Sequence, residues 1–113
     1  MITDIFARNE VSLGPLGQIP PGEGRNFDMQ GLRIAVFHTR AGEVFATQAE
    51  CPHRIGPLAD GLLGGTSLVC PLHAWKFDLR TGQALYGDCD LTIYPVRLSA
   101  EGEILLTLDS ERE

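Results

Sequence analysis

Residues 51–82 of this chain read CPHRIGPLADGLLGGTSLVCPLHAWKFDLRTG. Two short arms in this stretch each combine a thiol with an imidazole. The first arm contains Cys51 and His53, and the second contains Cys70 and His73, with sixteen residues between His53 and Cys70. Soft thiolate and imidazole ligands together bind transition metals. The two arms therefore predict that these four side chains hold one metal site.

Two kinds of metal centre suit this donor set. A tetrahedral zinc site with two Cys and two His is chemically possible. Zinc fingers, however, usually place both Cys in one arm and both His in the other, whereas each arm here mixes the two. A Rieske centre needs two Cys on one iron and two His on the other. Mixed arms satisfy this need, so the pattern favours an iron–sulfur cluster over zinc, and over four unrelated residues.

The stretch resembles the cluster-binding segment of Rieske ferredoxins, whose pattern is Cys-x-His, a spacer of similar length, and Cys-x-x-His. The resemblance extends roughly from Leu32 to Leu108. It implies an all-β fold, with an antiparallel β sandwich or barrel base and a small cluster-binding subdomain of two loops. It also implies a [2Fe-2S] cofactor bound by Cys51, His53, Cys70 and His73.

The remainder of the chain has the composition of a β scaffold. Thirteen Gly and seven Pro punctuate short apolar runs, as in folds with many turns. We expect a single domain over residues 1–113, with the cluster-binding insertion at about 49–82. We expect an irregular loop at 14–24, a closing turn at 99–102, and strands at 26–29, 32–39, 44–47, 66–69, 75–79, 92–98 and 103–108.

The charge balance restricts the partners. Nine Lys and Arg against fifteen Asp and Glu give a net charge of −6, which argues against nucleic acid and anionic membranes as partners. The sequence has no apolar run near the roughly 20 residues of a membrane span and no signal-peptide pattern. We therefore expect a cytoplasmic protein. Three cysteines do not form a disulfide framework.

The resemblance leaves two electron-transfer roles open. One is the small subunit of an NAD(P)H-dependent nitrite reductase, with a flavin- and sirohaem-containing large subunit as partner. The other is a ferredoxin between a ferredoxin reductase and an aromatic-ring dioxygenase. The first is favoured by His73-Ala74-Trp75, by Gly87–Cys89 with Tyr94–Val96, and by the lack of Pro in residues 83–92. A structural or regulatory subunit with a non-catalytic cluster is the alternative from another class.

No independent catalytic site is expected. The chain is too short for a terminal oxygenase, and His38 is the one histidine outside the two arms; we expect it to be a packing or surface residue. Cys89 is expected to be a structural thiol, and Trp75 a buried aromatic.

The reduction potential is expected to be low. Trp75 and Phe77 stand where the high-potential branch of the resembled family carries hydroxyls, and Gly56 and Leu72 stand where it carries disulfide cysteines. Hydrogen bonds to the sulfurs raise the potential. Their absence predicts a value near the low end of the Rieske range, about −150 mV.

Overall fold

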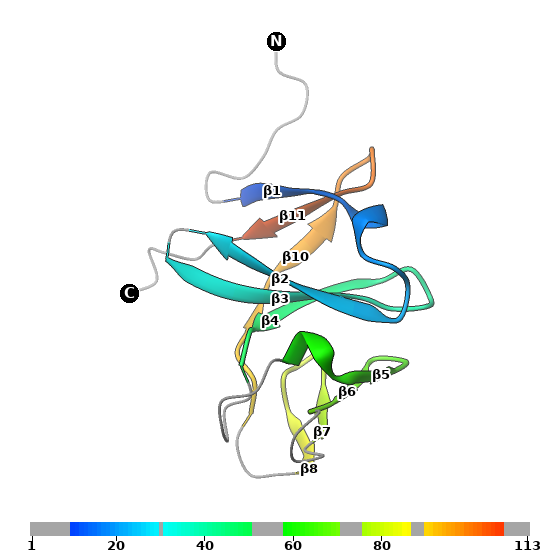
Figure 1. The fold of residues 1–113 in the computed structure, drawn as a ribbon, viewed down its shortest axis with the longest axis vertical. Helices are drawn as coiled ribbons and strands as arrows, with labels where there is room; N and C mark the ends of the chain where they lie inside the picture. The colour runs from blue at the N-terminus through cyan, green and yellow to red at the C-terminus, as the bar shows by residue number, and fades with distance from the viewer. Residues whose placement is uncertain (1–9, 30, 51–57, 71–75, 87–89, 108–113) are drawn as a thin grey trace.

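The computed structural model describes residues 10–29, 31–50, 58–70, 76–86 and 90–107. These residues form β-strands and two 3₁₀ turns, without an α-helix among them, which confirms the predicted all-β class (Figure 1). This part of the chain contains no helix that is both long and hydrophobic enough to span a membrane. The elements are β1 (Glu10–Pro15), η1 (Leu16–Gln18), β2 (Glu23–Met29), β3 (Leu32–His38), β4 (Val44–Gln48), η2 (Leu58–Asp60), β5 (Leu62–Gly64), β6 (Ser67–Val69), β7 (Lys76–Asp78), β8 (Ala84–Tyr86), β9 (Ile93–Tyr94), β10 (Val96–Leu98) and β11 (Glu103–Thr107).

The strands form three antiparallel sheets. Two of them, with strand orders β1-β11-β10 and β2-β3-β4-β9, make up what we call the base. The third, with order β5-β6-β7-β8, lies at one end of the molecule beside η2, and we call it the loop sheet (Figure 1). The chain thus leaves the base after β4 and returns to it at β9.

Each of the two regions has its own hydrophobic core. The base core is made of aliphatic side chains, namely Ile19, Ile34, Val36, Ala46, Ile104 and Leu106. The loop-sheet core also contains aromatic rings and a thiol, and its buried members are Ala35, Phe37, Leu58, Leu68, Cys70, Phe77, Leu79 and Leu91.

Strand β3 is the wall that both cores share. Its residues 34–37 are all buried, and successive side chains of a strand point to opposite faces of the sheet. Ile34 and Val36 accordingly enter the base core, whereas Ala35 and Phe37 enter the loop-sheet core. The unbroken apolar run in this strand therefore contributes side chains to both cores.

The structure corrects several predicted boundaries. The expected strand at 92–98 is two strands, β9 paired with β4 and β10 paired with β11. Pro95 lies between them, and proline has no N–H to donate to a ladder. The expected loop at 14–24 includes the end of β1 and the start of β2, and strands β1, β5 and β8 were not predicted.

Candidate metal centre

The first predicted arm lies in the connection from β4 to η2. The Leu58 N–H donates a hydrogen bond of 2.9 Å to the Ala49 carbonyl, which joins the two ends of this loop. Leu58 is fully buried in the loop-sheet core. Cys51 and His53 belong to this loop by sequence, and both lie outside the described residues.

The second predicted arm lies in the hairpin between β6 and β7. Val69 and Lys76 form the last pair of this ladder, so residues 70–75 connect the two strands. Cys70 directly follows β6, is 1% exposed and has a free thiol. His73 and Trp75 lie outside the described residues.

A third connection, from β8 to β9, returns to the same core. The Asp90 carboxylate accepts a hydrogen bond of 2.8 Å from the Ala84 N–H, and the Leu91 N–H donates to the Gly82 carbonyl at 2.7 Å. Gly82 has a φ of +82°, and a Cβ there would lie 2.7 Å from Ile93 Cγ1. A side chain at this position would therefore push the connection away. Cys89 lies outside the described residues.

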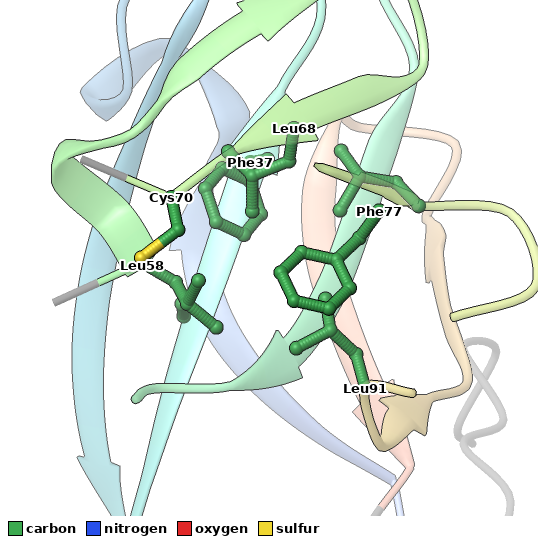
Figure 2. Packing of buried hydrophobic residues seen from close by; sticks show 8 residues of the cluster. Phe37, Leu58, Leu68, Cys70, Phe77 and Leu91 are labelled. Atoms are coloured by element: carbon green, nitrogen blue, oxygen red, sulfur yellow. The ribbon is translucent and has the colours of Figure 1, made fainter. Parts of the chain in front are cut away.

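Each of the three connections has one described residue in the same hydrophobic core. Leu58 ends the first, Cys70 begins the second and Leu91 ends the third, and all three side chains belong to the loop-sheet core (Figure 2). Phe37 of β3 packs in the same cluster. The fold thus joins the boundaries of both predicted arms through a single hydrophobic contact region.

Cys70 is the one predicted donor that the structure describes, and its buried thiol fits a metal centre of the predicted kind. Cys70 supplies a buried thiol at the start of the second arm, and the first arm is closed beside it at Leu58. Among the described residues, no group of three or more His, Cys, Asp or Glu could hold a metal ion. Three of the four predicted ligands lie outside that part of the chain, so this result leaves the predicted set untested.

The structure also shows the surroundings of His38 and Phe77. The Nδ1 atom of His38 lies 2.6 Å from the Ile19 carbonyl oxygen, in keeping with the expected packing role. Phe77 is fully buried, and Figure 2 shows its ring beside Leu91. A hydroxyl on that ring would enter the hydrophobic core.

A surface hollow of about 670 Å³ borders the first loop, and it is lined by Asp28, Gly31, Arg33, Gln48, Ala49 and Glu50. A hydrogen bond from Arg33 holds the pKa of the exposed Asp28 carboxyl below its ordinary value of 3.8. The same hydrogen bond raises the pKa of Arg33. The Gln48 carboxamide also makes two hydrogen bonds here, and no motif in the sequence had marked this residue.

Residues 9–95 match the family model of the Rieske [2Fe-2S] domain. The chain is 39% identical over 106 residues to the ferredoxin component of a 2,4-dinitrotoluene dioxygenase system from Burkholderia sp. (strain RASC), covering 92% of this chain and 100% of that one. It is 34% identical over 95 residues to the ferredoxin component of naphthalene 1,2-dioxygenase/salicylate 5-hydroxylase systems from Ralstonia sp., covering 82% and 90%.

Among solved structures, the fold is similar to a protein from Mycobacterium tuberculosis described as an NADH-dependent nitrite reductase small subunit. The TM-score is 0.81 at 22% identity, over 88% of this chain and 94% of that one. At this level of identity the likeness speaks for the fold alone.

Proposed function

Because this chain belongs to the Rieske [2Fe-2S] domain family, we propose that it is the electron-carrying ferredoxin of an aromatic-ring dioxygenase system. A Rieske cluster accepts and donates one electron at a time. The two relatives named above, which this chain matches over 90% and 100% of their length, are dioxygenase ferredoxin components. The cytoplasmic location expected from the sequence remains part of this proposal.

We infer that Cys51 and Cys70 bind one iron and that His53 and His73 bind the other, within a cluster-binding insertion at about 49–82 of a single domain. The observation that carries this inference is the shared hydrophobic core at the boundaries of the two arms, where Leu58 and the Cys70 thiol are buried together. Two thiolates and two imidazoles are the ligands that a Rieske centre requires.

Electron paramagnetic resonance of the reduced protein tests the ligand set. Replacing His73 by Ala should abolish the Rieske signal, whereas Cys89→Ser should leave it unchanged. Iron and acid-labile sulfide should be present in equal amounts in the unaltered protein. Loss of the signal in the Cys89 variant would contradict the assignment, and absence of iron would favour a structural subunit.

A nitrite reductase large subunit is the second candidate partner. It is favoured by His73-Ala74-Trp75 and by the lack of Pro in residues 83–92. Stopped-flow mixing of the reduced protein with an aromatic-ring oxygenase component, and separately with a flavin- and sirohaem-containing nitrite reductase, distinguishes the two. We expect rapid oxidation by the oxygenase. Rapid oxidation by the nitrite reductase alone would reverse the assignment.

The charge distribution supports docking at the cluster end. Residues 51–82 contain three basic and two acidic residues, giving +1, whereas the remainder contains six and thirteen, giving −7. Lys76 is exposed beside the second loop. Exposed charges steer encounter and are screened by salt. Reversing Arg54 and Lys76 together to Glu should therefore slow electron transfer at low ionic strength, and transfer rates that do not vary with salt would argue against this surface.

A further inference from the structure

The Gln48 carboxamide joins two backbone segments that are distant in sequence. Its Nε2 donates a hydrogen bond of 2.8 Å to the Glu50 carbonyl. Its Oε1 accepts one of 2.8 Å from the Thr92 N–H. The Gln48 N–H also donates to the Thr92 carbonyl at 3.1 Å. One residue at the end of β4 therefore links the start of the first loop to the chain that returns into β9.

The Glu50 carbonyl is part of the peptide group that leads into residue 51. A peptide group is planar, so fixing its oxygen restricts the orientation of the whole unit. The neighbouring Ala49 carbonyl accepts the Leu58 N–H at the other end of the loop. Gln48 thus restrains the entry to the first arm, while the Ala49–Leu58 hydrogen bond joins the two ends of the loop that contains it.

The Thr92 contact ties this restraint to the loop-sheet core. Thr92 follows Leu91, whose side chain packs in the same core as Leu58 and Cys70. The carboxamide therefore connects the entry of the first arm with the segment that follows Leu91, whose side chain lies in the same core as Cys70. Residues that contact a ligand-bearing backbone in this way tune a metal centre without binding it.

We propose that Gln48 is a positioning residue for the [2Fe-2S] cluster, acting through the Glu50 carbonyl and the Thr92 N–H. This inference rests on the ligand set proposed above. Both hydrogen bonds are exposed to solvent, so water can replace them and their loss should cost little folding stability. The effect should fall on the cluster itself, which separates a positioning role from a merely structural one.

The test compares Gln48→Leu with Gln18→Leu. Gln18 is a matched control because its Nε2 also donates to a backbone carbonyl, that of Leu13, at 2.8 Å, but it lies in η1 of the base. Each purified holoprotein is measured for the width of its Rieske resonance lines, for the rate of cluster loss to an iron chelator, and for its urea midpoint. Gln48→Leu should broaden the lines and accelerate cluster loss roughly tenfold. Gln18→Leu should change neither.

A second variant, Gln48→Glu, separates the two contacts, since it keeps an acceptor for Thr92 but loses the donor to Glu50. Cluster loss as fast as in Gln48→Leu would assign the effect to the Glu50 contact, and intermediate loss would divide it between the two. Unaltered line width and cluster lifetime in Gln48→Leu would overturn the proposal. If the unaltered protein carries no Rieske signal, the proposed function fails instead, so the two failures are distinguishable.

Discussion

The base and the loop sheet are built from the same kind of strand but are held together differently. In the base, β2 and β3 pair along their whole length, from Glu23 with His38 to Met29 with Leu32. In the loop sheet every strand has three residues. Short ladders provide few hydrogen bonds, and small hydrophobic cores provide little stability by themselves.

The composition of the two cores follows this difference. The buried members of the base core are all aliphatic, with Phe27 and Tyr94 packed against them, whereas the loop-sheet core includes the Cys70 thiol and Leu58 at the end of the first loop. Metal binding contributes directly to the stability of sites that it organises. We therefore expect that packing is sufficient to stabilise the base, and that the loop sheet depends on the cluster as well.

The largest effects are expected from equal truncations in the two cores. Leu58 and Leu106 are both fully buried, so replacing either by Ala should destabilise the protein by about 2–5 kcal/mol in urea unfolding. Only Leu58→Ala should also shorten the lifetime of the cluster in a chelator assay, because Leu58 packs with Cys70. Equal cluster lifetimes in the two variants would remove the distinction between the regions.

Removing the cluster should affect the two regions unequally. Hydrogen exchange of the apoprotein should accelerate in β6 and β7 on the order of a hundredfold relative to the holoprotein, equivalent to about 2.7 kcal/mol. Exchange in β3 and β11 should change far less. Reconstitution with iron and sulfide should restore the protection. Uniform acceleration across both regions would mean that the base depends on the cluster too.

The contact between the regions can be altered at Gly24 of β2. A Cβ there would lie 2.6 Å from the Phe37 ring and 3.2 Å from Ala59 Cα in η2. We expect Gly24→Ala to cost about 1–3 kcal/mol through overpacking. Gly64→Ala is the control, because nothing lies within 4 Å of a Cβ on that strand glycine. Similar urea midpoints for the two variants would show that Phe37 and η2 move aside freely.

The sequence predicted strands in both regions and missed strands in both, among them β1 of the base. The apolar run of β3 and the Ser99–Gly102 turn both have strong local signals, and both were predicted within a residue. Strands β5 and β8 were missed, whereas β6 and β7, which are equally short, were predicted at 66–69 and 75–79. An alternating pattern over three residues is a weak signal. The expected strand at 92–98 was wrong because Pro95 marks a change from one sheet to another, which depends on tertiary pairing.

The sequence predicted which residues could bind the cluster, but not the tertiary contacts that would position them. Cys and His spacing marks the proposed ligands directly, and of these Cys70 lies within the described residues, buried at the start of its loop. Gln48 has no comparable signature. Its role depends on Thr92, 44 positions away, and on the carbonyl of Glu50, so only the folded chain reveals it.

The smallest effect is expected from the Arg33–Asp28 ion pair on the base, beside the hollow at the first loop. The two groups are 2.8 Å apart, with 59% and 67% of their side chains exposed. Exposed pairs contribute little stability and are screened by salt. Arg33 lowers the pKa of Asp28 below 3.8, so the pair stabilises the fold above that pH, and this contribution disappears as the pH falls through the folded-state pKa.

Nuclear magnetic resonance titration of the Asp28 carboxyl measures this directly, and Arg33→Gln should return its pKa toward 3.8. The urea midpoints of the unaltered protein and Asp28→Asn should differ slightly at neutral pH and converge when the pH is well below 3.8. Because the pair lies on the base, neither variant should change the width of the Rieske lines. A changed line width would mean that the charges at the rim of the hollow act electrostatically on the cluster. The base would then contribute to the environment of the cluster.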